Sequence, residues 1–242
     1  MTILATETSA IDRFTDPLYS LAEASRYLGL SSSTFRSWAR GYEMRANGHT
    51  VTGRPVITAL GAPGRRGASI PFVSLAEGYA LTAIRKSGVP LQRIRPALEQ
   101  LNKEMGIGHA LASRRLFTDG AEVLYDYAAR VDDDEAAAVR DLVVVRQNQR
   151  VFPEVVESYL KRITWGSDGY AIAVPLPGFE QADVVADARR GFGQPTFIHG
   201  GARLEDVLAL FDAGEPITAV AAEFGLTSIE VEDAIRNRDK KS

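Results

Sequence analysis

Residues 19–40 read YSLAEASRYLGLSSSTFRSWAR, and this run predicts two short helices separated by a sharp turn. Ser20 and Glu23 form a capping box, the S-x-x-E pattern with which many helices begin. Gly29 can adopt the left-handed conformation that ends a helix, and Ser31 is a candidate N-cap for a second one. The sequence therefore predicts a helix-turn-helix.

The second of these helices separates apolar from polar side chains. Phe35 and Trp38 fall on the inward face. Short hydrogen-bond donors and arginines remain on the other face, and such side chains bind phosphates and base edges in a major groove. The alternative is a packed helical hairpin whose polar face is only solvated. The candidate DNA-binding residues are Ser32, Ser33, Thr34, Arg36, Ser37 and Arg40.

A glycine-rich segment follows the second helix. Residues 51–58 and 68–73 are β-prone runs, and the loop between them carries Arg65 and Arg66. Two strands joined by such a loop predict the wing of a winged helix-turn-helix, with both arginines as further candidate DNA contacts. A solvated surface loop is the alternative.

Two helices are expected next. Ser74 and Glu77 repeat the capping-box pattern, and Pro90 begins a second helix that ends near Gly106. Helix-turn-helix, wing and helix pair, in this order over roughly the first 105 residues, resemble the MerR-like winged helix-turn-helix group, which implies DNA binding. The chain departs from that group because no long dimerising coiled coil, sensing cysteine or ligand domain follows, so a stress-sensing role is not carried over.

Charge is divided unevenly along the chain. Residues 1–110 hold 13 Lys and Arg against 8 Asp and Glu, whereas residues 111–242 hold 15 against 23. A basic N-terminal part predicts a polyanionic partner for that part. The chain has no cysteine, which excludes disulfides and thiolate metal sites. No apolar run approaches the roughly 20 residues of a membrane span, so a cytoplasmic protein is expected.

The chain is predicted to be α+β, with four parts. Residues 1–16 are expected to form a flexible arm and residues 17–106 the winged helix-turn-helix. Residues 107–179 are expected to form a hairpin-rich α+β unit and residues 180–242 a helical domain. In the third part we expect a hairpin across Asp119-Gly120, a solvated acidic turn at 132–135, hairpins across 147–149 and 166–169, and a helix that begins at Pro153.

The last part repeats the pattern of the first motif. Thr227 and Glu230 form a capping box just after Gly225, which predicts a second helix-turn-helix. Its second helix is expected to present Glu230, Glu232 and Asp233 outward, where carboxylates would repel DNA phosphates. We therefore expect this motif to bind protein or to dimerise.

Residues 184–197 read VVADARRGFGQPTF and resemble the start of an antitoxin domain found in VapB-type antitoxins. Segments 201–204, 213–216 and 221–226 fit the helices of that domain, although Ala188 stands where members commonly have proline. The resemblance implies an antitoxin that binds a PIN-like ribonuclease toxin and represses its own operon. Binding to double-stranded operator DNA as a homodimer is the corresponding expectation.

A PIN-like active site is a cluster of carboxylates that hold a divalent metal, so an inhibitor needs cations to fill it or a surface to cover it. Arginine pairs with carboxylates in bidentate fashion. The candidate toxin-binding residues are Arg189, Arg190, Arg236 and Arg238. The alternative for the tail is a solvated helix end whose cations offset the helix dipole.

Nothing in the sequence predicts catalysis. The three histidines, His49, His109 and His199, are scattered and lack metal-ligand spacing. No enzyme activity, cofactor or metal is therefore expected. Two other hypotheses remain, a MerR-like transcription regulator without a toxin partner, and an enzyme or small-ligand protein that uses the middle unit.

Overall fold

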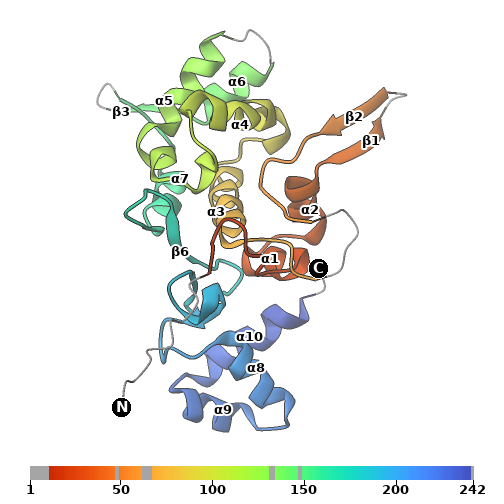
Figure 1. Ribbon diagram of the computed structural model, residues 1–242, viewed down its shortest axis with the longest axis vertical. Coiled ribbons are helices and arrows are strands. Elements are labelled where there is room, and N and C mark those ends of the chain that lie inside the picture. Colours follow the sequence, from red (N-terminus) through yellow and green to blue (C-terminus); the bar gives the residue numbers. More distant parts are fainter. Residues whose placement is uncertain (1–10, 47–48, 62–66, 131–133, 147–148, 241–242) are drawn as a thin grey trace, which may run out of the picture.

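The computed structural model describes residues 11–46, 49–61, 67–130, 134–146 and 149–240. It is an α+β protein in which helices predominate over three small antiparallel sheets. Figure 1 shows an elongated molecule with α4, α5 and α6 at one end and α8, α9 and α10 at the other. None of the described helices is both long enough and apolar enough to span a bilayer.

The helix-turn-helix is confirmed. It consists of α1 (Leu21–Tyr27) and α2 (Ser32–Arg40). Both hydrogen bonds of the Ser20–Glu23 capping box are present: the Glu23 amide donates to Ser20 Oγ and the Ser20 amide donates to Glu23 Oε2. At the start of α2, the Thr34 amide donates to Ser31 Oγ at 3.3 Å. These local capping interactions fix where each helix begins.

The wing lies earlier in the chain than predicted. The hairpin is formed by β1 (Tyr42–Ala46) and β2 (His49–Gly53). Residues 54–60 are not a strand, and residues 68–73 contribute only a bridge between Ile70 and Tyr19 before a helix begins. The predicted strands were wrong because residues 49–53 pair with the preceding residues 42–46 and not with residues that follow them in the sequence. Arg65 and Arg66 lie outside the described residues.

The next two helices are α3 (Phe72–Lys86) and α4 (Leu91–Met105). The predicted Ser74–Glu77 capping box was wrong, because the N-cap of α3 is Pro71 and no side chain caps it. All residues from Phe72 to Ile84 are buried, so Ser74 and Glu77 belong to the core. The helix that follows Pro90 and ends at Gly106 is confirmed.

The hairpin predicted across Asp119-Gly120 was also wrong. This region is a helix, α5 (Arg114–Arg130), preceded by the 3-10 turn η1 (Ala110–Ala112) and followed by α6 (Asp134–Asp141). Gly120 serves close packing, because a Cβ there would lie 2.9 Å from Leu116 and 3.3 Å from Phe152. Of the turn predicted at 132–135, residues 132–133 lie outside the described residues, whereas Asp134 and Glu135 belong to the first turn of α6 and not to a loop.

The remaining middle elements agree with the prediction. The hairpin of β3 (Val144–Arg146) and β4 (Gln149–Val151) is followed by α7 (Glu154–Leu160), whose N-cap is Pro153. The pair β5 (Thr164–Trp165) and β6 (Ala171–Pro175) comes next. With β7 (Val184–Asp187) and β8 (Pro195–Phe197) they form one sheet in the order β5-β6-β7-β8. The sequence predicted that one part ends at residue 179 and the next begins at residue 180. The pairing of β6 with β7 places residues from both parts in one sheet.

The C-terminal helices are confirmed. They are α8 (Leu204–Asp212), α9 (Ile217–Phe224) and α10 (Ser228–Asp239), and Thr227 and Glu230 form the expected capping box. Between β7 and β8 lies the short turn η2 (Gly191–Gly193).

Helix α10 connects this helical unit to the N-terminal motif. Asn237 Nδ2 donates to the carbonyls of Arg26 on α1 and of Gly178, at 3.2 and 3.0 Å. Gly178 N in turn donates to the carbonyl of Tyr27 at 2.8 Å, and a Cβ at Gly178 would collide with the Arg26 carbonyl. Glycine is thus required where the two backbones meet.

Of the flexible arm expected at residues 1–16, residues 1–10 lie outside the described residues, whereas residues 11–16 pack on the molecule. Phe14 meets Tyr170 edge to face with ring centroids 5.2 Å apart. Arg13 pairs with Asp168 and donates to the Ala171 carbonyl at 3.1 Å. The segment therefore links the N-terminal motif to the β5–β6 turn.

Candidate functional site

Helix α2 is anchored by its apolar face. Phe35 is completely buried and Trp38 is 2% exposed, with their ring centroids 6.4 Å apart. Gly78 on α3 leaves room for Phe35, since a Cβ there would lie 2.9 Å from its ring. The orientation of α2 is therefore fixed from behind, by the core.

The opposite face of α2 carries the candidate DNA contacts. Ser33 and Arg36 are exposed, whereas Ser32, Thr34 and Ser37 are half-buried. All three hydroxyls of Ser33, Thr34 and Ser37 have local partners. Ser33 Oγ and Thr34 Oγ1 lie 3.1 and 2.8 Å from Ser31 Oγ, and Ser37 Oγ donates to the Thr34 carbonyl at 2.8 Å. Among these five residues, Ser33 and Arg36 are thus the most accessible to a ligand.

Arg40 has a different environment from Arg36. Its guanidinium donates to the carbonyls of Leu60 and Gly61 at 3.0 and 2.9 Å. The Trp38 carbonyl accepts hydrogen bonds from Val56 and Ile57 nearby. Arg40 therefore holds residues 54–61 against α2, just before the segment that contains Arg65 and Arg66.

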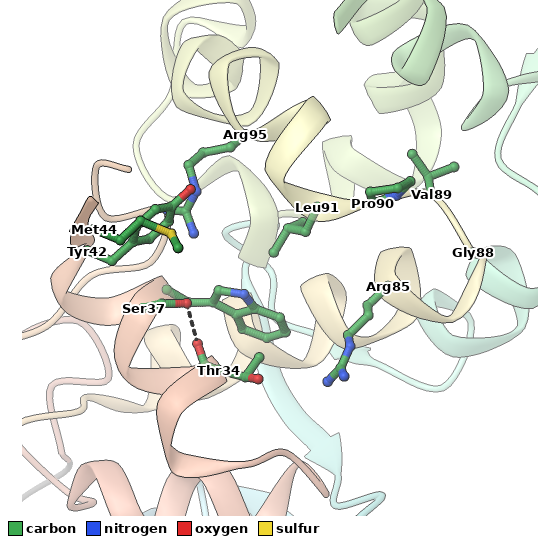
Figure 2. A pocket seen from close by; sticks show the side chains of 11 residues that line it. Thr34, Ser37, Tyr42, Met44, Arg85, Gly88, Val89, Pro90, Leu91 and Arg95 are labelled. Carbon is green, nitrogen blue, oxygen red and sulfur yellow. Dashed lines mark hydrogen bonds between the residues drawn. The ribbon is translucent and has the colours of Figure 1, made fainter. Parts of the chain in front are cut away.

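A groove of about 530 Å³ runs beside α2 (Figure 2). Thr34 and Ser37 line it on one side, β1 on another, and the α3–α4 turn closes it. Arg85, in the last turn of α3, is exposed and lines this groove. Sequence reasoning missed Arg85, although the pair Arg85-Lys86 at a predicted helix end was visible. Its proximity to α2 depends on tertiary packing.

Arg95 also lines the groove, and its side chain has partners within the chain, although its buried Nε atom has no hydrogen-bond partner among the described residues. Its guanidinium lies over the Tyr42 ring at 5.3 Å and donates to the Arg54 carbonyl. Burial lowers the pKa of Arg95 from its ordinary value. We conclude that Arg95 supports the wing, because Tyr42 and Arg54 flank the hairpin of β1 and β2.

The wing exposes apolar side chains. Met44 and Val51 are paired across the hairpin and are 51% and 42% exposed. Cross-strand neighbours of this kind form a continuous surface. Met44 also lines the groove beside α2, so the β1–β2 hairpin and α2 share one face of the molecule.

Three of the four candidate toxin-binding arginines are paired within the chain. Arg189 binds Asp187 in bidentate fashion, with distances of 3.0 and 2.8 Å. Burial raises the pKa of Asp187, but the hydrogen bonds from Arg189 outweigh it and the pKa is lowered overall. Arg236 lies 3.6 Å from Glu232 and 3.7 Å from Asp233, and Arg238 lies 2.6 Å from Asp212.

Arg190 differs from the other three. It is exposed, and its side chain makes no ion pair with any described residue. Two residues later, Phe192 is 54% exposed and has a φ of 55°, a strained value for a residue other than glycine. Phenylalanine and arginine are both enriched at protein–protein interfaces, so this exposed pair is a candidate binding surface.

Of the three carboxylates predicted to face outward on α10, only one is exposed. Glu232 is exposed, but Glu230 and Asp233 are buried. Glu230 belongs to the capping box, and Asp233 Oδ2 accepts hydrogen bonds from the backbone amides of residues 180–182 at 2.7–3.0 Å. These two carboxylates serve the fold, so the charge argument against DNA binding by α10 loses most of its basis.

The described residues contain no group of three or more His, Cys, Asp or Glu that could hold a metal ion. A smaller cluster joins Glu77 and His109, whose Oε1 and Nδ1 atoms lie 3.0 Å apart. Glu77 Oε2 also accepts a hydrogen bond from the Thr58 amide at 2.8 Å. The hydrogen bond to Glu77 raises the pKa of His109.

Comparison with known proteins identifies the N-terminal motif. Residues 17–98 match a family described as "Putative DNA-binding HTH domain". This agrees with the helix-turn-helix seen in α1 and α2, while the finer likeness to MerR-like proteins stays a prediction.

Relatives resemble nearly the whole chain. "Putative antitoxin VapB45" of Mycobacterium tuberculosis strain H37Rv is 49% identical over 92% of this chain and 94% of its own length. "Uncharacterized protein Rv2308" of the same organism is 28% identical over 94% of this chain and 91% of its own length. The X-ray crystal structure of Rv2018 from Mycobacterium tuberculosis has 45% identity and a TM-score of 0.74, over 91% of this chain and 98% of that one. The chain therefore belongs to the VapB45 antitoxin family and carries a DNA-binding helix-turn-helix domain at its N-terminus.

Proposed function

We propose that this protein is a non-enzymatic regulator that binds its operator DNA as a homodimer, represses its own operon, and neutralises a PIN-like ribonuclease toxin. The observation that supports DNA binding best is the exposed Ser33–Arg36 face of an α2 whose other face is locked into the core. A rigid helix with exposed polar side chains is suited to reading base edges.

In this proposal the residues on α2 divide into two roles. Ser32, Ser33, Thr34, Arg36 and Ser37 face the major groove. Arg40 acts through the backbone that it holds, carrying the segment with Arg65 and Arg66 to the phosphates or the adjacent minor groove. Arg85 adds a cation at the edge of the same face.

The toxin-binding proposal rests on the family and on Arg190. Of the four candidates, Arg190 alone has no ion pair with a described residue, so it can meet a toxin carboxylate without first losing one. Arg189, Arg236 and Arg238 stay proposed contacts that would exchange their present carboxylates for those of the toxin.

The first test uses operator DNA and the full chain. Arg36→Ala is expected to weaken specific binding by about 1–3 kcal/mol and to relax the sequence preference at one base. Arg65→Ala and Arg66→Ala should weaken binding to all sequences and flatten its salt dependence. Arg114→Ala, at an exposed residue on α5, is the control. Fluorescence anisotropy at several salt concentrations measures these effects, and unchanged affinity in all three variants would refute the docking mode.

The second test concerns the toxin. The tagged full chain should co-purify with a PIN-like ribonuclease encoded beside it and should stop that enzyme from cleaving RNA. Arg190→Ala should weaken inhibition, whereas Arg162→Ala, at an exposed arginine that likewise forms no ion pair with a described residue, should not. A chain that neither binds nor inhibits the ribonuclease would leave only a transcription regulator.

A further inference from the structure

The C-terminal helical unit, taken as residues 180–240, has an open groove between α8 and α9. The groove has a volume of about 680 Å³. Ala209 and Leu210 of α8 and Phe224 of α9 contribute apolar surface to it. Its other prominent feature is a set of three carboxylates, from Asp206, Glu215 and Glu223.

Few positive charges lie near the carboxylates of this groove. No lysine or arginine lines the groove, and Asp206 has Arg203 as a distant partner at 3.8 Å. Glu215 and Glu223 are exposed and form no ion pair with any residue that the structure describes. Residues 180–242 as a whole contain 12 acidic and 7 basic side chains. The groove therefore offers two free negative charges beside an apolar floor.

The groove is also distant from the proposed DNA-binding face. Figure 1 shows α8 and α9 at the end of the molecule opposite α4–α6, with α2 and the wing on the other side of α1. The arginines of α10 pair with carboxylates outside the groove. Arg238 pairs with Asp212 and Asp239, and Arg236 pairs with Glu232 and Asp233. A segment bound in the groove would leave α2 free for DNA.

We propose that this groove binds a basic amphipathic helix of the toxin. The proposal rests on the function proposed above and names the surface that performs it. The apolar side chains of such a helix would cover Leu210 and Phe224, and its lysines or arginines would pair with Glu215 and Glu223, which is the usual helix-in-groove mode with complementary charge. Here the antitoxin supplies the carboxylates and the toxin the cations, so this contact lies apart from the acidic centre of the ribonuclease.

Two pairs of full-length variants test the groove against the PIN-like ribonuclease that the second test above is expected to identify. Glu215→Lys/Glu223→Lys reverses the free charges, and its control Asp141→Lys/Asp183→Lys makes the same change in net charge at exposed carboxylates that lie outside the groove and form no ion pair with a described residue. Ala209→Arg fills the groove, and its control Ala222→Arg adds the same side chain at an exposed position of α9 that does not line it.

Affinity is measured by calorimetry, with a thermal melt of every variant. Both groove variants are expected to bind the toxin roughly tenfold or more weakly, the controls to bind like the parent, and the parent to weaken as salt is raised. The charge reversal affects only exposed side chains, so it remains informative if Ala209→Arg fails to fold.

Each other outcome has a definite meaning. A parent chain that does not bind the ribonuclease overturns the proposed function and the groove assignment together. A parent that binds, with groove variants that bind equally well, overturns the groove assignment alone. If Ala209→Arg converts a dimer to a monomer in light scattering while toxin affinity is kept, the groove holds a second copy of this chain and the proposal is wrong.

Discussion

At the scale of single residues, the structure separates the side chains that face a ligand from those that hold the scaffold. Arg36 and Arg40 are four residues apart and look equivalent in the sequence. Arg36 is exposed, whereas Arg40 bonds two backbone carbonyls some twenty residues later. Burial of Phe35 and Trp38 could be predicted from helical spacing alone. The engagement of Arg40 could not, because it depends on the path of a distant loop.

His109 gives a prediction at this scale. Its pKa is raised by the hydrogen bond to Glu77, so the folded protein binds the proton more tightly than the unfolded chain does. The resulting stability is fully present below the ordinary His pKa of 6.5 and is lost as pH rises through the raised value. Urea unfolding between pH 5.5 and 9 should show the loss in the parent and a flatter curve in His109→Gln.

The control is His49→Gln, because His49 is exposed on β2. Other titrating groups are common to all three proteins, so the difference between the curves isolates His109. Equal slopes for the parent and His109→Gln would show that the Glu77–His109 pair does not contribute.

At the scale of elements, prediction succeeded for several local signals, although the equally local Ser74–Glu77 capping box was wrong. The capping boxes at Ser20 and Thr227 and the glycine at position 106 lie next to the ends that they fix, and each was found. The wing was predicted but placed too late in the chain, although its two strands are neighbours in the sequence, and α5 was predicted as a hairpin. Asp119-Gly120 is a typical hairpin signal, yet Gly120 lies inside a helix because Phe152, distant in sequence, packs against it.

The anchoring of α10 is one such long-range feature, and it can be tested. Asp233 is 1% exposed and accepts three backbone hydrogen bonds from residues 180–182. Asp233→Ala would leave these amides unpaired in a buried place and should lower the free energy of unfolding by about 3 kcal/mol. Glu232→Ala, at the exposed neighbour, should change it by less than about 0.5 kcal/mol. Similar denaturation midpoints for both variants would show that residues 180–182 do not depend on Asp233.

At the scale of the whole molecule, α3 determines what can fold alone. It is buried along nearly its entire length, and it packs against α7, β6 and η1 as well as against α1 and α2. Tyr79 Oη on α3 donates to the Tyr159 carbonyl of α7 at 3.2 Å. A predicted domain boundary after residue 106 would leave one side of this helix uncovered, which the composition of residues 17–106 does not reveal.

We therefore expect a fragment of residues 1–106 to lack the cooperative melt of the full chain, because the apolar surface of α3 that faces α7 would be exposed to water. Mixing it with residues 107–242 should restore a cooperative transition and operator binding, since the missing contacts come from that half. Circular dichroism and fluorescence anisotropy follow both properties. If the isolated fragment melts as sharply and at the same temperature as the full chain, and binds operator alone, then α3 does not need α7 and the boundary at 106 is a real domain boundary.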